Sequence, residues 1–393
     1  MDYQHNYSVH HPKTIKKILW IGPVLNESCY FLPAVSPAAC KWQESLIREF
    51  IDSGVKVHVL THIPAQLFPK GALWSAGDTN ALPEKIPGVV FGHLNILFLR
   101  SLYLKFLYHH KINQIVDVER PDLILTYNIP IYFTYGAYRT QQKLGIPWIP
   151  LITDMDTRLD KHWSNFDMHA RRATARIFFS WKNYVTCPFS KKFFFEGGVK
   201  SLKAINKRGK SDNGQLRIVY AGGLRESAGF PLLLKAIQCI QDKKFEFHIC
   251  GKGMPQSDIE SISNDRRIIF HGPVTEKELE HICLQADAFI NPRPSTFDEN
   301  DNNFPSKIHD YLQYQKPIFS TFTAGISPEY KKILIEIEQE DPVYLANRIT
   351  ELVHWNTDNF EAYRALVTEF VTHDKLWSNQ ARNLLAWITK TIK

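Results

Sequence analysis

A polar, acidic loop that leads into a predicted helix carries the residues most suited to binding chemistry. The loop follows an apolar run at residues 288–290 and continues to Phe304-Pro305-Ser306-Lys307, where the helix should begin. In open α/β sheets, ligands bind at the edge where strands hand over to helices. Backbone N–H groups near Pro305 would attract an anion such as a diphosphate, and Asp310, one turn further, could bond sugar hydroxyls. The stretch predicts nucleotide-sugar binding, and the alternative is a plain polar loop with Ser306 near the helix cap.

Two carboxylates and a histidine follow predicted strands in the first half of the chain. Asp154 and Asp156 come directly after apolar residues 148–152, and His62 follows the apolar run at 55–60. Side chains at the ends of parallel strands meet at one edge of the sheet. We therefore expect them at a cleft, where an acceptor-side base or a group that orients a hydroxyl would act. The alternative for the two aspartates is an Asx cap on the following turn.

Strand-like and helix-like patterns alternate along both halves of the chain. In the first half the patterns predict strands at 18–22, 55–60, 123–127, 148–152 and 184–187, and helices at 37–53 and 132–144. In the second half they predict strands at 216–220, 245–250, 268–270 and 288–290, and helices at 231–240, 276–285, 306–315, 342–354 and 360–371. Such alternation favours an α/β fold with parallel, doubly wound sheets.

The length and a change of composition predict two domains. The 393 residues exceed what one hydrophobic core usually supports, and residues 200–214 (KSLKAINKRGKSDNG) have the composition of a linker. We expect one domain over residues 1–200 and a second over residues 201–373. The final helix, within residues 374–393, carries apolar residues and is expected to pack back on the first domain.

The composition also indicates the cellular compartment in which the protein works. A net charge of +7 weakly favours anionic partners, and six cysteines without a C-x-x-C pair indicate buried thiols in a reducing compartment. Residues 1–17 hold no apolar run of the signal-peptide type, and the apolar region 96–108 is interrupted by Arg100 and Lys105. We expect a cytoplasmic protein that can contact the inner face of the membrane peripherally.

Basic and aromatic residues are interleaved between residues 171 and 195. The cations are Arg171, Arg172, Arg176, Lys182, Lys191 and Lys192, and the aromatic residues include Phe178, Phe179, Trp181, Phe193, Phe194 and Phe195. Such a surface could lie on an anionic leaflet, where a lipid-linked acceptor would be found. The alternative is an aromatic stripe that faces the core, with solvated cations. No nucleic-acid-binding module is recognisable, so nucleic acid is not expected as a partner.

Several motifs of the second half resemble those of known glycosyltransferases. They are Tyr220-Ala221-Gly222-Gly223-Leu224, the glycine turn at 247–253, His271-Gly272-Pro273-Val274, Asn291-Pro292-Arg293 and the segment 304–312. Together with the order of the elements they resemble the GT-B fold, in which two Rossmann-like domains face each other across a cleft. The motifs are similar to those of the large retaining family four of that fold, also called glycosyl transferases group 1. Segments 37–42, 68–71 and 195–198 resemble acceptor-domain segments of bacterial polysaccharide transferases.

The resemblance implies an N-terminal acceptor domain and a C-terminal donor domain that binds a nucleotide diphosphate sugar as co-substrate, with no other cofactor and no metal. Lys307 would stabilise charge on the leaving diphosphate, and Asp154, Asp156 and His62 are the candidates on the acceptor side. The donor-binding candidates are Gly222, Gly223, Arg225, Gly251, Pro273, Val274, Arg293, Asn302, Asn303, Phe304, Pro305, Ser306, Lys307 and Asp310.

Two departures from the family pattern affect the donor site. The family usually has two glutamates eight positions apart, and the corresponding residues here are Asn302 and Asp310. The amide of Asn302 could still bond sugar hydroxyls, as could that of Asn303. The family's arginine and lysine after the first donor strand have no match, so Arg225, Arg293 or Lys307 would have to neutralise the diphosphate.

The sequence therefore predicts a retaining, metal-independent hexosyltransferase that acts on a saccharide or lipid-linked saccharide during surface polysaccharide synthesis. An inverting enzyme with Asp154 as its base would show the same pieces. Two further alternatives have the same fold: a non-catalytic protein that binds a nucleotide sugar, and a sugar-nucleotide epimerase or phosphorylase.

Overall fold

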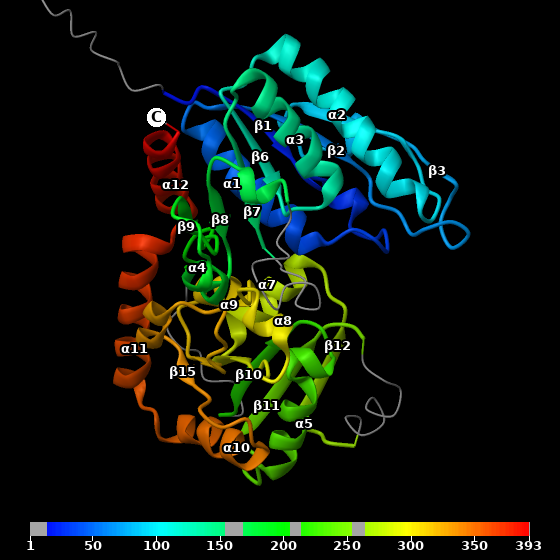
Figure 1. The fold of residues 1–393 in the computed structure, drawn as a ribbon. Helices are drawn as coiled ribbons and strands as arrows, with labels where there is room; N and C mark the ends of the chain where they lie inside the picture. Colours follow the sequence, from blue (N-terminus) through cyan, green and yellow to red (C-terminus); the bar gives the residue numbers. More distant parts are fainter. Residues whose placement is uncertain (1–13, 154–167, 205–213, 254–263, 393) are drawn as a thin grey trace, which may run out of the picture.

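The computed structural model describes residues 14–153, 168–204, 214–253 and 264–392, which form two lobes (Figure 1). The N-terminal lobe contains β1 (Lys17–Ile21), α1 (Pro37–Asp52), β2 (Lys56–His62), β3 (Trp74–Ser75), β4 (Gly88–Phe91), β5 (His93–Leu94), α2 (Leu99–Glu119), β6 (Leu123–Tyr127), α3 (Ile131–Leu144), β7 (Trp148–Ile152), β8 (Arg176–Phe178), α4 (Trp181–Thr186) and β9 (Lys192–Phe194). The C-terminal lobe contains β10 (Leu216–Ala221), α5 (Phe230–Cys239), β11 (Phe245–Cys250), β12 (Ile268–Gly272), α7 (Glu276–Gln285), β13 (Ala288–Asn291), α8 (Asp298–Asp301), α9 (Lys307–Leu312), β14 (Ile318–Ser320), β15 (Ile335–Glu336), α10 (Pro342–Thr350) and α11 (Thr357–Phe370). The last helix is α12 (Trp377–Thr391).

Each lobe is built on a parallel sheet, which confirms the predicted fold class. The strand orders are β4-β2-β1-β6-β7-β8-β9 in the first lobe and β12-β11-β10-β13-β14-β15 in the second. In both sheets the order reverses beside the first strand, since β1 lies between β2 and β6, and β10 lies between β11 and β13. Such a switch point leaves a crevice at the carboxyl ends of the strands. In the second lobe, that edge holds most of the predicted donor residues.

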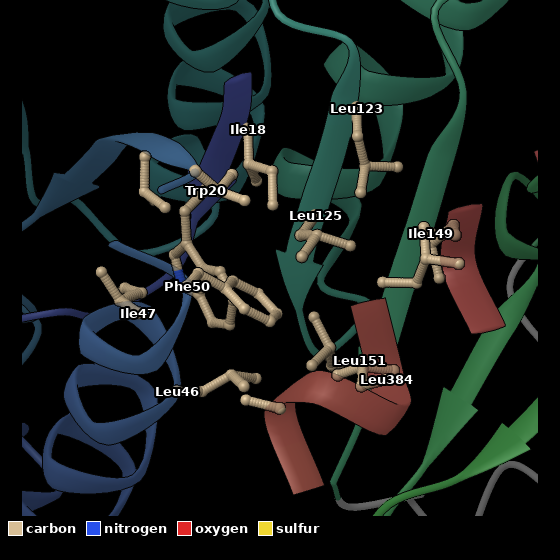
Figure 2. Packing of buried hydrophobic residues seen from close by; sticks show 14 of the residues in the cluster. Ile18, Trp20, Leu46, Ile47, Phe50, Leu123, Leu125, Ile149, Leu151 and Leu384 are labelled. Carbon is tan, nitrogen blue, oxygen red and sulfur yellow. The ribbon is translucent and has the colours of Figure 1, made fainter. Parts of the chain in front are cut away.

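The residues of β1 show why the first sheet is covered on both faces. Ile18 and Trp20 belong to one hydrophobic core, and Leu19 and Ile21 belong to another. Successive side chains of a strand point to opposite faces, so an unbroken apolar run requires a layer on each side. Figure 2 shows the first of these cores, in which Ile18 and Trp20 lie close to side chains from α1 and β6.

The C-terminal helix lies on the N-terminal lobe. Leu384 and Ile388 of α12 are fully buried in the same core as Trp20, and Leu384 is seen there in Figure 2. The chain thus returns after the second lobe is complete. Where it returns, Val199 pairs with Leu376 as an isolated parallel bridge, so the two connections between the lobes run side by side.

Several aromatic residues of the segment 171–195 belong to the first lobe's core, while Arg172 and Lys191 are exposed. Phe178 and Phe195 are fully buried, and the Arg176 guanidinium lies 4.0 Å from the centre of the Phe189 ring while its Nε donates to the Ala170 carbonyl. The aromatic stripe therefore has the alternative, core-facing arrangement. The strand predicted at 184–187 is wrong, because Ser180 accepts a hydrogen bond from the Asn183 backbone N–H and caps helix α4.

Two further observations concern the state of the cysteines and the apolar character of the helices. None of the six cysteines forms a disulfide; five are buried and Cys239 is exposed. Among the helices of the described residues, none combines the length and the apolar character that a membrane span requires.

Candidate functional site

Three glycine-containing turns form the edge of the second sheet. The Gly222 N–H donates to the Cys250 carbonyl over 2.9 Å, and the Gly251 N–H donates to the Gly272 carbonyl over 2.8 Å, so the turns after β10, β11 and β12 are joined. A Cβ added to Gly251 would lie 1.8 Å from the carbonyl oxygen of Gly222. The turns pack backbone against backbone, which only glycine permits at this approach.

A second close approach brings the loop after β13 to the same place. A Cβ added to Gly229, which precedes α5, would lie 1.7 Å from the Pro292 carbonyl oxygen. The backbone next to Arg293 therefore lies against the turn that begins at Arg225. The turn that begins at Arg225 and the loop at Arg293, about 70 positions apart in the sequence, are thus neighbours in space.

Lys307, the first residue of α9, is directed at the Gly222 turn. Its Nζ lies 4.4 Å from the centre of the Tyr220 ring and 2.6 Å from where a Gly222 Cβ would stand. This ammonium nitrogen is buried and has no hydrogen-bond partner among the described residues. An enclosed ammonium without an acceptor is unfavourable unless a ligand supplies one.

Two arginines stand near Lys307, and together the three residues are here called the cation cluster. Burial, and then the charges of Arg293 and Arg225, lower the pKa of the Lys307 ammonium to about 7. Arg293 donates from Nη1 to the Asn303 Oδ1 over 2.6 Å, and Arg225 Nη2 is 4.0 Å from a Glu299 carboxylate oxygen on the exposed side. The cation cluster has an excess of positive charge that a diphosphate would neutralise.

Asp310 lies one turn after Lys307, near the boundary between the lobes. Its side chain keeps exposed surface that a ligand could reach, while the protein around it raises the pKa of the carboxyl to about 6, mainly by desolvation and against the pull of Lys41. Lys41 of α1 is itself bonded to Glu276 of α7. This ion pair between the lobes, which the sequence did not predict, places α1 beside the predicted ribose-binding residue.

The loop before α9 is held by its own backbone and by the first lobe. The Asn302 side chain donates from Nδ2 to the Asp298 carbonyl over 2.8 Å, and the Asn302 carbonyl accepts from Asn183 of α4 over 3.1 Å. Lys182 Nζ lies 3.1 Å from Asp301 Oδ2. One N–H of the amide predicted to orient a donor sugar is therefore used within the loop, and α4 fixes the loop from the other lobe.

The start of α9 differs from the predicted one. The helix spans only Lys307–Leu312, and Ser306, its exposed N-cap residue, makes no side-chain cap bond. Phe304 is buried and stacks on the His309 ring with 4.6 Å between centres, and the Pro305 carbonyl accepts from the Ile308 N–H. A helix this short supplies little dipole, so the positive charge for an anion comes mainly from the cation cluster.

The remaining donor candidates lie on the adjoining turns. Pro273 is exposed and Val274 half-buried after β12, directly before Thr275, which forms a capping box with Glu278 at the start of α7. Gly223 is exposed, and its carbonyl accepts from the Tyr220 hydroxyl over 2.6 Å.

Of the acceptor-side candidates of the first lobe, His62 lies within the described residues. His62 is buried, its Nδ1 lies 2.7 Å from the Tyr108 hydroxyl, and burial together with His93 lowers the pKa of its imidazole to about 3. A neutral ring packed among aromatic residues has the environment of a core histidine. Asp154 and Asp156 lie outside the described residues.

A buried polar chain behind the site was also missed by the sequence analysis. His309 Nε2 lies 2.7 Å from the Tyr330 hydroxyl, which donates to Glu196 over 3.0 Å, and Lys375 donates to both Glu196 and Glu329 over 2.6 Å. Glu196 and Lys375 lie on the two connections between the lobes. These contacts link the connections to α9, which carries Lys307 and Asp310.

The Gly222→Ala variant should bind nucleoside diphosphates about tenfold more weakly, roughly 1.4 kcal/mol, because the new methyl would displace the Lys307 ammonium from a charge-assisted contact and would strain the turn at its φ of +156°. Titration calorimetry with UDP, GDP and CDP measures this. Gly223→Ala is the matched control, since a Cβ there meets nothing closer than Arg225 Nε at 3.7 Å. Equal losses in both variants would show that the Lys307 contact is not the cause.

Comparisons with known proteins agree with the geometry. Residues 203–363 match the family Glycosyl transferases group 1. No significant match was found among curated proteins. The fold is similar to sucrose-phosphate synthase from Thermosynechococcus elongatus, with 12% identity, 95% of this chain and 98% of that chain covered, and a TM-score of 0.67.

Two further structures show the same two-lobed arrangement. The Anabaena protein HepE, in complex with UDP, has 13% identity, 96% of this chain and 100% of that chain covered, and a TM-score of 0.66. A Listeria monocytogenes protein described as a UDP-N-acetylglucosamine 2-epimerase has 12% identity, 97% coverage of both chains and a TM-score of 0.60. At such identities the likeness concerns the fold, and the chain thus has the GT-B fold and carries a Glycosyl transferases group 1 domain at residues 203–363.

Proposed function

We propose that the protein is a glycosyltransferase that moves a hexosyl group from a nucleotide diphosphate sugar to a saccharide or lipid-linked saccharide in surface polysaccharide synthesis. The observation that carries this proposal is the enclosed, unpartnered ammonium of Lys307 at the switch point between β10 and β13. With Arg225 and Arg293 it faces the place where negative charge would grow on a leaving diphosphate. The match of residues 203–363 and the UDP held by HepE support the donor class.

In this scheme different residues of the chain bind different parts of the donor. The cation cluster would hold the diphosphate without a metal, and Asp310 would accept hydrogen bonds from the ribose hydroxyls. Pro273 and Val274 would lie beside the base, and Asn303, held by Arg293, would lie nearest the sugar. We further propose retention of the anomeric configuration, as the resemblance implies, with an acceptor held by the first lobe.

Nucleotide release tests the function. The protein would be incubated with UDP-, GDP- and CMP-sugars, with and without saccharide and lipid-linked acceptors and with and without EDTA. A transferase releases nucleotide faster when its acceptor is present, and NMR of the product reports the anomeric configuration. Release or sugar inversion that needs no acceptor would indicate an epimerase, and binding without turnover in every combination would indicate a binding protein.

The pH dependence of kcat/KM for the donor should be bell-shaped, with an acid limb near pH 6 and an alkaline limb near pH 7. Asp310 is a stronger acceptor of hydrogen bonds from the ribose hydroxyls when ionised, above its pKa of about 6, and Lys307 attracts phosphate by its charge when protonated, below its pKa of about 7. This profile reports the free protein. Asp310→Asn should remove the acid limb and weaken donor binding. An unchanged limb and full donor affinity in that variant would contradict the ribose assignment.

A further inference from the structure

An exposed apolar surface on the first lobe has no place in the sugar-transfer scheme. At the start of α2, Phe98 is 89% exposed, and Leu99, Leu102 and Phe106 are each more than half exposed. These four residues, with Phe68, Leu73 and Trp74 of the neighbouring loop, are here called the apolar tip. Soluble proteins rarely gather so many large apolar side chains at one place without a partner.

The apolar tip is one continuous feature. The Phe68 N–H donates to the Asn95 carbonyl, the Asn95 N–H donates to the Leu73 carbonyl, and Arg100 donates from Nη1 to the Ala65 carbonyl. Trp74 pairs with Leu94 between β3 and β5. These bonds tie the loop to the start of α2. In Figure 1, α2 and β3 lie on the outer part of the upper lobe, away from the lobe that holds the cation cluster.

The backbone at Phe98 supports a functional origin for this exposure. Its φ is +66°, in a region that bulky residues rarely adopt. Strain of this kind persists where surrounding structure enforces it, and it is concentrated at functional positions. The Phe98 ring is displayed to solvent at an energetic cost that packing within the chain does not explain.

Positive charge predominates in the layer behind the apolar tip. Residues 86–116 and 123–153, which include α3 and all of α2 except its last three residues, contain no Asp or Glu, whereas their Lys and Arg residues are Arg100, Lys105, Lys111, Arg139 and Lys143. The two helices pack together, since Ile112 and Ala137 share one core and Lys105 Nζ lies 4.2 Å from the centre of the Tyr135 ring. The two acids of α2, Asp117 and Glu119, lie at its far end, about 28 Å or more from Phe98 at 1.5 Å per residue.

We propose that the apolar tip and the basic face of α2 and α3 dock the protein on an anionic lipid bilayer. Apolar side chains beside cations suit the interface, where rings enter the headgroup region and Lys and Arg meet anionic lipids. A second copy of the chain is a poorer occupant, because a symmetric dimer would set these cations against their own copies. The surface differs from the 171–195 stripe considered from the sequence, in which Phe178, Phe179 and Phe195 are buried.

Vesicle co-sedimentation tests the docking independently of sugar transfer. We expect the full chain to bind vesicles of phosphatidylglycerol and phosphatidylcholine at least about tenfold more tightly than vesicles of phosphatidylcholine alone, with much of the difference lost at 0.5 M NaCl. Trp74, which is 53% exposed, should shift its fluorescence to the blue on binding. Equal binding to both vesicles, or binding to neither, would overturn the proposal.

Variants test whether vesicle binding depends on the apolar tip or is unspecific adhesion of the protein. The triple variant Phe98→Asn, Leu102→Ser and Phe106→Ser should lose about tenfold or more in binding to the anionic vesicles, and Asn tolerates the positive φ at position 98. The matched control replaces three exposed apolar residues of the other lobe, Phe270→Asn, Val343→Ser and Leu366→Ser, and should bind as the wild type does. Arg139→Gln with Lys143→Gln should weaken only the binding that depends on anionic lipid.

Two results would overturn the assignment. One is vesicle binding by the triple variant equal to that of the wild type, with circular dichroism showing that both are folded. The other is a dimer in sedimentation equilibrium that the triple variant abolishes, since the apolar tip would then be an interface between copies. Because no donor is present, neither result depends on whether the protein transfers sugar.

Discussion

Replacing Lys307 with methionine is expected to lower kcat with the preferred donor by about 10²- to 10³-fold, the usual loss when one group that stabilises developing negative charge is removed from an enclosed site. The ammonium is buried, points at the Gly222 turn and lacks a partner that would otherwise use its charge. Methionine keeps much of the length and the apolar stem of the side chain but removes the ammonium that lies over the Tyr220 ring. The loss should therefore be one of charge and not of packing.

Proton uptake on nucleotide binding gives a second test of the role of Lys307. Since the pKa of Lys307 is about 7 without ligand and a bound diphosphate would raise it, nucleotide binding near pH 7.5 should take up protons. Calorimetry of UDP, GDP or CDP binding in buffers of different ionisation enthalpy measures the uptake, which Lys307→Met should abolish. The affinity of the wild type should fall as the pH rises above 7.

Lys316→Met is the matched control for Lys307→Met. Lys316 is also an enclosed lysine of the second lobe, with a pKa lowered to about 8 by burial, but its Nζ donates to the Cys283 and Leu284 carbonyls. Its loss should affect stability and leave kcat of the folded protein within severalfold. If Lys307→Met keeps kcat within the same range, the cation cluster does not stabilise the leaving group.

The sequence pattern was sufficient for the architecture. The parallel strands and the switch point follow from local periodicity in the sequence. The glycine turns follow from residues such as Gly222, whose neighbours in space are also turns. The sequence left Arg225, Arg293 and Lys307 as alternatives for the diphosphate. The structure brings all three together, because the Gly229 and Pro292 backbones touch, a contact that spacing cannot reveal.

The features that the sequence did not show concern burial and side-chain partners, which the folded structure decides. Arg176 and the phenylalanines near it have the pattern of an exposed basic stripe, yet pairing of β8 between β7 and β9 buries them. His62 ends its strand as expected, but Tyr108 of α2 covers it. Asn302 stands where the family has a glutamate, and its amide bonds to the carbonyl four residues earlier. For Arg176 and His62, the partner comes from a fold that one sequence does not specify locally, whereas the Asn302 amide is bonded within its own loop.

Lys375→Met is expected to lower the free energy of unfolding by about 3–5 kcal/mol at pH 8, because it leaves the Glu196 carboxylate buried without its cation. Both side chains are almost fully enclosed, and the remaining donor to Glu196 is the Tyr330 hydroxyl. Glu329, the second partner of Lys375, is partly exposed and can be solvated instead. Urea unfolding followed by circular dichroism would measure the loss.

The loss of stability in Lys375→Met should grow as the pH rises. Burial already raises the pKa of Glu196 and Lys375 lowers it, so removing Lys375 raises the pKa further. The unfolded chain ionises this carboxyl near pH 4.3, whereas the folded variant keeps its proton to a higher pH. Between those values the unfolded state binds fewer protons, so the stability of the variant falls as pH rises. The deficit relative to the wild type should be smaller at pH 5 than at pH 8.

Two further variants decide whether the buried charge is the cause. Glu196→Gln combined with Lys375→Met removes both charges and keeps a group that can bond Tyr330, so it should recover much of the lost stability and its dependence on pH. Lys203→Met breaks a more exposed pair with Glu280, 2.7 Å long, and should cost about 1 kcal/mol or less. A double variant no more stable than Lys375→Met would mean that lost packing between the two connections of the lobes, and not an unpaired carboxylate, destabilises the protein.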